Sequence, residues 1–358
     1  MEQTIQSRAG LRRTLGQVLA ITGTTLIEAI QQPVAFLILL SAVLMTLLVP
    51  VFEFQRFSED GRLARDSGLS CMLVFGLVLA AGTAGRSVAE EISRGTVAAV
   101  IGKPVSRVTF LLAKWLGVVA VVAVFWCGVL ASTLVAERCS AHFVTLEDFV
   151  GDATDPVTLT LGFAGVAVAL IVAAVRHYVW RRRFGVSAFV GVTASQALVA
   201  LLSAVCSRFG QLFPALGQAA CEGEHARVSS QLLLYHPALN LRVIPVALLV
   251  LFALAVFAAL ATALATRLQT GAALAVCATV LILGLAGDSL MGHAPLFSAR
   301  GLAAGVLPDV QSFWLCDAVA RGGRVAAGYV AMAGAYALTC CALCLTAGCW
   351  AFQERDLG

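Results

Sequence analysis

The sequence contains few charged residues. Only 12% of its 358 residues are Asp, Glu, Lys or Arg, whereas 60% are hydrophobic. A soluble domain carries about a quarter charged residues, because its surface faces water. So few charges cannot cover a water-exposed surface, which excludes an ordinary soluble protein.

Several motifs of enzymes and secreted proteins are also missing. No Gly-x-x-x-x-Gly-Lys-Ser/Thr phosphate loop occurs, so the chain has no ATPase motif of its own. No histidine has a second ligand at metal-ligand spacing on a hydrophobic run, and Asp288 with His293 comes closest to a pair.

The eleven cysteines do not form a metal-binding pattern, although a disulfide among Cys139, Cys206, Cys221 and Cys316 stays an alternative. No secretory signal is expected at the N-terminus, because no short apolar core precedes a small-residue cleavage site.

Hydrophobic residues instead form long runs. A run of about 18 apolar residues is long enough to cross a hydrocarbon core of about 30 Å as a helix. The runs are apolar on every face, as in Val246–Leu264, and do not show the alternation of a membrane β-barrel. We therefore predict an all-α membrane protein, a polytopic helical bundle that forms a single transmembrane domain over residues 1–358. Eight spans are expected, of which the fourth and fifth are the weakest: Val34–Phe52, Leu69–Gly85, Phe110–Ala136, Leu159–Val179, Ser187–Cys206, Val243–Thr266, Gly271–Ser289 and Val325–Phe352.

The distribution of charge predicts the orientation. With eight spans and a cytoplasmic N-terminus, the cytoplasmic segments have a net charge of +8 and the outer segments −4. Basic residues are enriched in cytoplasmic loops, so both termini are expected inside. The cluster formed by Arg176 and Arg181–Arg183 contributes most, with Tyr178 and Trp180 beside it. A topological anchor is the simplest interpretation of this cluster, and lipid headgroup binding is the alternative.

The residues before the first span predict a separate helix. Apolar side chains recur at helical spacing over residues 11–30, with polar residues between them. This pattern is typical of an amphipathic helix that lies on the membrane surface. Pro33 follows, at a position where proline can start a helix. A disordered tail before a longer first span is the alternative.

The segment between the second and third spans, residues 86–109, is longer than a simple turn and contains residues that typically start and end helices. Glu90 and Glu91 suit the early turns of a helix, where negative charge is favoured. Thr96 can cap a short apolar helix that Gly102 and Pro104 end, and Ser106 can cap the next helix. An apolar patch between charged hinges suits contact with a cytosolic partner. The alternative is an interfacial loop that packs against its own helical bundle.

This stretch resembles the signature of the ABC-2 type permeases, the membrane subunits of type V-like ABC exporters. The family pattern has an acidic residue, a Gly-Thr step, a short apolar helix, a Pro-x-x-Arg step and a lysine before the next span. The matching residues here are Glu90, Glu91, Arg94, Gly95, Thr96, Val97, Val100, Pro104, Arg107 and Lys114. In that family the segment is a coupling helix that docks on the ATP-binding subunit.

The resemblance extends over most of the chain. It implies an elbow helix at 11–30 and half-inserted or outer helices at 287–323. It also implies a six-helix core, so the pair of spans and the outer loop within 159–240 look like an insertion. The implied function is export across a bacterial inner membrane by a homodimer of this permease. ATP and Mg would bind a separate ATP-binding subunit, this chain would hold no cofactor, and membrane lipid but no nucleic acid would contact it.

Two other classes of function stay open at this stage. An ion-coupled secondary carrier usually has charged residues at mid-membrane, and the predicted spans contain none there. A membrane-embedded enzyme is the less favoured alternative, because no catalytic group or metal site stands out.

Overall fold

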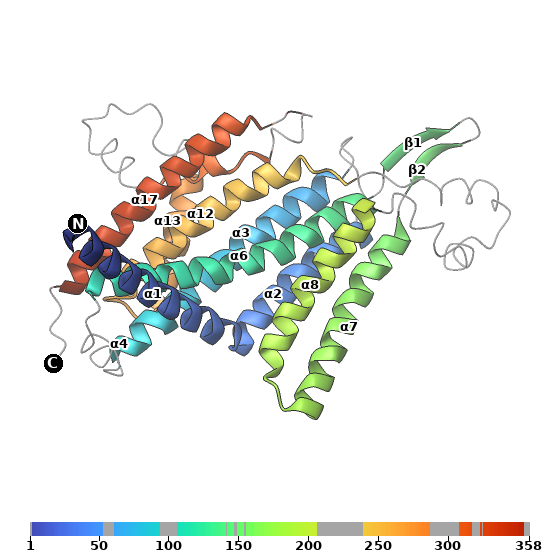
Figure 1. Cartoon of the computed structure of the whole chain (residues 1–358). Coiled ribbons are helices and arrows are strands. Elements are labelled where there is room, and N and C mark those ends of the chain that lie inside the picture. The colour runs from blue at the N-terminus through green and yellow to red at the C-terminus, as the bar shows by residue number, and fades with distance from the viewer. Residues whose placement is uncertain are drawn as a thin grey trace, which may run out of the picture.

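The chain folds into a helical bundle, as its computed structural model shows (Figure 1). The structure describes residues 2–52, 61–93, 106–140, 142–146, 149–153, 155–205, 239–286, 308–316, 323 and 325–353. Seven helices in these ranges are long and apolar enough to cross a membrane. This confirms the predicted all-α membrane class and a multi-pass topology. The seven are α2 (Pro33–Leu48) with its 3-10 turn (Val49–Val51), α3 (Arg62–Ala84), α6 (Arg107–Cys139), α7 (Pro156–Trp180), α8 (Phe184–Val205), α12 (Val243–Leu264) and α17 (Ala327–Gln353).

The structure differs from the predictions at three places, two of them in predicted spans. The helix of the second span does not stop at Gly85 but continues through a π-helical turn (Gly85–Glu90) into α4 (Glu91–Ser93). The seventh predicted span is a helix of only 16 residues, α13 (Thr270–Leu285), and residues 287–289 lie outside the described part. Sequence analysis did not predict the antiparallel hairpin of β1 (His142–Leu146) and β2 (Phe149–Ala153).

The long helix α6 lies at the centre of the bundle. It contacts α1, α2, α3, α7, α8, α12 and α17. Small residues allow the close approach of its neighbours. A Cβ atom built on Gly68 of α3 would lie 2.4 Å from Oγ1 of Thr133 on α6, so only glycine fits there. Helix α6 therefore links both halves of the bundle.

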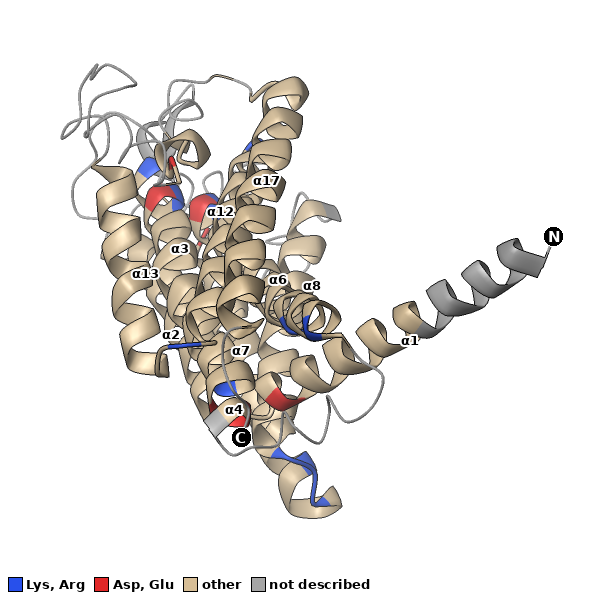
Figure 2. Ribbon diagram, turned by 90° about the vertical axis from the view of Figure 1, so that its left-hand side faces the viewer, with Lys and Arg blue, Asp and Glu red and all other residues tan. Residues whose placement is uncertain are grey.

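Helix α1 (Glu2–Ile30) crosses α6 and projects from the side of the bundle (Figure 2). Thr22 Oγ1 donates to the Ala113 carbonyl at 3.1 Å, and a Cβ on Gly117 would lie 2.6 Å from Thr25 Cβ. Leu15 and Leu19 are exposed. The predicted helix at 11–30 is thus part of a longer helix, with an apolar surface left outside the bundle.

Helices α7 and α8 form the hairpin that sequence analysis predicted as an inserted pair. The hairpin packs on α6 and α2 mainly through α8. Gln196 of α8 is fully buried, and its Nε2 donates to the Gly162 carbonyl of α7 at 3.0 Å. Ser132 Oγ of α6 lies 3.4 Å from Gln196 Oε1. The side chain therefore ties α8 to both neighbours.

The bundle has two ends, named here by residues of α6. The Arg107 end holds the start of α6 and the ends of α4, α12 and α17. The Glu137 end holds the end of α6 and the starts of α3, α7 and α12. Segment 308–316 also packs on the bundle, where Tyr329 Oη donates to the Ser312 carbonyl at 2.6 Å and Tyr336 Oη accepts from Asp309 N at 3.0 Å.

Candidate functional site

Lys114 lies in the second turn of α6, and its ammonium group is buried. Its Nζ is 2.6 Å from Oε1 of Glu91, and the two side chains are 4% and 27% exposed. The ammonium also lies 5.6 Å from the ring centroid of Phe110. A buried charge is tolerated only with a partner, because it has lost its water shell. The ion pair therefore holds α4, and with it the end of α3, against α6.

Arg107, the first residue of α6, holds the last turn of α17. Its Nη1 donates to the carbonyl oxygens of Phe352 and Gln353, each at 3.0 Å. Its guanidinium lies 5.5 Å from the centroid of the Phe352 ring. The last carbonyls of a helix have no partner within that helix, and a cation beside them is favoured by the helix dipole. Arg107 thus joins the start of α6 to the end of α17.

A small apolar cluster, called here the Phe110 cluster, lies beside these contacts. The rings of Phe110 and Phe352 stack with centroids 6.3 Å apart and planes 26° apart. The cluster draws on the extension of α3, the start of α6 and the ends of α12 and α17. A movement of any one of these four ends must therefore disturb the other three. Its buried members are Val88, Ile92, Phe110, Ala265 and Phe352.

Replacing Arg107 by Ala should fray the last turn of α17, because two carbonyl oxygens lose their donor. We expect faster hydrogen–deuterium exchange at residues 349–353 and a loss of about 1–2 kcal/mol in the free energy of unfolding. Mass spectrometry of the C-terminal peptide measures the exchange. Arg107→Lys is the matched control, since it keeps the charge and one donor, and should give an intermediate rate. Unchanged exchange in the Ala variant would contradict this role of Arg107.

The structure brings together part of the predicted coupling site. Glu91, Arg107 and Lys114 meet at the Arg107 end, and Glu90 lies in the π-helical turn just before Glu91. The predicted cap is confirmed, since Ser106 Oγ accepts from Thr109 N at 3.0 Å. The remaining predicted residues lie outside the described part of the chain: Arg94, Gly95, Thr96, Val97, Val100 and Pro104.

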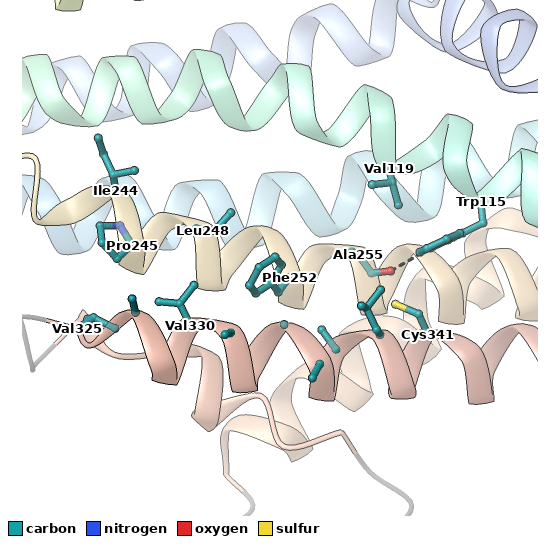
Figure 3. A pocket seen from close by; sticks show the side chains of 16 residues that line it. Trp115, Val119, Ile244, Pro245, Leu248, Phe252, Ala255, Val325, Val330 and Cys341 are labelled. Atoms are coloured by element: carbon teal, nitrogen blue, oxygen red, sulfur yellow. Dashed lines mark hydrogen bonds between the residues drawn. The ribbon is translucent and has the colours of Figure 1, made fainter. Parts of the chain in front are cut away.

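A long apolar groove of about 850 Å³ lies between α12 and α17. Figure 3 shows Ile244 and Val325 at one end and Trp115 of α6 at the other. Trp115 Nε1 donates to the Ala255 carbonyl at 3.2 Å, so its indole is fixed across that end. On α17 the groove is lined mainly by small residues, among them Gly334, and Phe252 faces them from α12. The groove can accept an apolar ligand or the helix of another copy.

Buried charges gather at the Glu137 end, where Figure 2 shows red and blue residues side by side. Oε1 of Glu137 lies 3.2 Å from Nη1 of Arg65 and accepts from Nδ2 of Asn240 at 2.8 Å. The Arg65 and Glu137 side chains are 6% and 7% exposed. These contacts hold α3 and the start of α12 against α6.

The next residue of α6, Arg138, binds the α7–α8 hairpin. Its Nε lies 3.2 Å from Oδ2 of Asp155, and both side chains are 1% exposed. Its Nη1 donates to the Ser203 carbonyl at the end of α8. Asp155 also caps α7, because it accepts from Thr158 N at 3.0 Å and from Thr158 Oγ1 at 2.7 Å. One arginine therefore fixes both helices of the hairpin.

The contacts of Arg65, Glu137, Arg138 and Asp155 were not predicted from the sequence. The expected span limits leave all four in outer loops, since charges end a hydrophobic run. A usable signal was present: Glu137 and Arg138 directly follow the long apolar run of the third span without a turn residue. A helix that continues through such a pair must find partners for both charges.

The described residues contain no group of three or more His, Cys, Asp or Glu side chains that could hold a metal ion. Asp288 and His293 lie outside the described part of the chain. Cys139 and Cys316 are free thiols, and Cys206 and Cys221 are not among the described residues. No protein-family model, curated protein or solved structure matches the chain.

Proposed function

We propose that this chain is the membrane subunit of an ABC transporter of the ABC-2 type. In this proposal residues 86–109 are the coupling segment on the cytoplasmic side of a bacterial inner membrane, and residues 94–105 are its central part. A separate subunit binds and hydrolyses ATP, and two copies of this chain form the permease. The transport direction is export.

One observation carries the proposal. The two flanks of segment 94–105 are anchored by a buried ion pair, Lys114 with Glu91, and by Arg107 on the carbonyls of α17. A force applied to the segment would therefore reach α3, α6, α12 and α17 together through the Phe110 cluster. A passive loop does not need such anchors, whereas a lever driven by a soluble motor does.

The groove between α12 and α17 is a second feature that suits a transport protein. Its walls are apolar, and no ion pair in the described part of the chain joins α12 to α17. We propose that the groove takes part in the substrate path or in the contact between two copies. A substrate path there suits an amphiphilic substrate, since charged groups in the described spans lie near their ends.

A photo-crosslinking amino acid tests the proposal. Placed at Val97 or Val100 in membranes of the natural host, it should give an adduct with a protein that binds and hydrolyses ATP. The matched control is the same amino acid at Val168, an exposed position near the middle of α7, where no soluble protein can reach. Adducts at Val97 and Val100 that contain only lipid or copies of this chain would overturn the coupling assignment. The ion-coupled carrier would then be the better proposal.

A further inference from the structure

A second apolar groove, of about 750 Å³, runs along the outer side of the α7–α8 hairpin. Its floor is made by small residues such as Gly165, Ala169 and Gly191, and larger side chains form its rims. It extends from Leu161 to Arg176 on α7, which corresponds to about 22 Å of helix. That length exceeds one leaflet of a hydrocarbon core, about 15 Å. An extended acyl chain therefore fits within it.

The groove opens at one end into a basic pocket of about 400 Å³. The two cavities share Arg176, Val186 and Ser187, so they form one continuous surface. The basic pocket also contains the three arginines of the α7–α8 turn and Gln31, which follows α1. In both Figure 1 and Figure 2 this turn is the lowest part of the drawing, and Figure 2 shows it in blue.

The turn is held in a defined conformation. Arg181 has a left-handed backbone with φ 52°, a conformation that usually requires glycine at a helix end. The Arg176 carbonyl accepts from the backbone N–H groups of Arg181 and Arg182. His177 Nδ1–H donates to the Arg182 carbonyl at 2.8 Å, and Arg183 donates to Oε1 of Gln31. The arginines are therefore gathered in one place before any ligand binds.

The charge of this turn is not neutralised within the described part of the chain. No Asp or Glu there forms an ion pair with Arg176 or with Arg181–Arg183. Arginine can bind a phosphate group with several donors at once. Its positive charge is also attracted to the negative surface potential of anionic lipids. Tyr178 and Trp180 beside it are 88% and 63% exposed, which suits the headgroup region of a membrane.

We propose that this surface binds one anionic phospholipid. Its phosphate lies among Arg176, Arg182 and Arg183, and one acyl chain lies in the groove between α7 and α8. A phospholipid suits this surface because the apolar groove and the basic pocket join at Arg176, which matches the two chemical parts of such a molecule. This binding does not depend on the proposed transport function.

Native mass spectrometry of the detergent-solubilised full chain tests this binding. We expect phosphatidylglycerol to bind about tenfold more tightly than phosphatidylcholine. The triple variant Arg176→Gln/Arg182→Gln/Arg183→Gln should remove this preference. Arg267→Gln is the matched control, because this exposed arginine lines neither cavity, and it should leave the preference unchanged.

A second variant tests the groove itself. Ala164 and Ala194 are exposed and line it, so Ala164→Leu/Ala194→Leu fills the groove without entering the core. This variant should lose bound phosphatidylglycerol at least as strongly as the triple variant. If inorganic phosphate displaces the lipid completely and the filled variant still binds normally, the site is one for free anions and the proposal is wrong. Equal binding of both lipids, or a second copy of the chain in the groove, would also overturn it.

Discussion

Replacing Glu91 by Leu should lower the free energy of unfolding by about 3 kcal/mol, the lower limit for loss of one partner of a buried ion pair. The reason is that the Lys114 side chain is only 4% exposed and has its ion pair with Glu91. In the variant the ammonium either stays buried without a counter-charge or pulls α6 away from α4. Equilibrium unfolding in mixed micelles of a mild detergent and SDS measures this change in the free energy of unfolding.

The matched control is Glu91→Leu/Lys114→Met. It replaces both charges by apolar groups of similar length, which leaves no buried charge, so most of the lost stability should return. A double variant as unstable as Glu91→Leu would show that the charge of Lys114 is not the cause. The double variant is also the better one for transport assays. A transport defect of Glu91→Leu alone would not distinguish loss of coupling from loss of folding.

The helices of the fold could be predicted well from the sequence, because each hydrophobic run must satisfy its own backbone in lipid. The ends were less predictable. The second span was expected to end at Gly85, yet the helix continues to Ser93, because Val88 and Ile92 find an apolar neighbour in Phe352. That neighbour is more than 250 positions away along the chain. No local pattern contains such a contact.

The candidate site was predictable in part for a related reason. Glu91, Arg107 and Lys114 were named because they match the pattern of the ABC-2 type permeases, and the structure shows which residues they contact. Lys114 and Glu91 pair across 23 positions, and Arg107 reaches α17 across 245. The buried charges at the other end could not be placed, because sequence alone does not show whether a charge after a span faces water or another helix.

Replacing Arg138 by Met should have a larger effect than the loss of Glu91. Both side chains of the Arg138–Asp155 pair are 1% exposed, so the Asp155 carboxylate would stay deeply buried without a counter-charge. We expect the free energy of unfolding to fall by about 3–5 kcal/mol. Hydrogen–deuterium exchange should rise first at the start of α7 and the end of α8, the two elements that Arg138 contacts.

The matched control is Arg138→Met/Asp155→Asn. Asn removes the charge but keeps an acceptor for Thr158 N, so the cap of α7 survives. Most of the stability should return, and about 1 kcal/mol should stay lost because the Ser203 carbonyl has no donor in either variant. If the double variant is no more stable than Arg138→Met, the buried charge of Asp155 is not the cause, and Arg138 acts mainly through Ser203. If neither variant is destabilised, the α7–α8 hairpin is held by the packing of α8 on α6 alone.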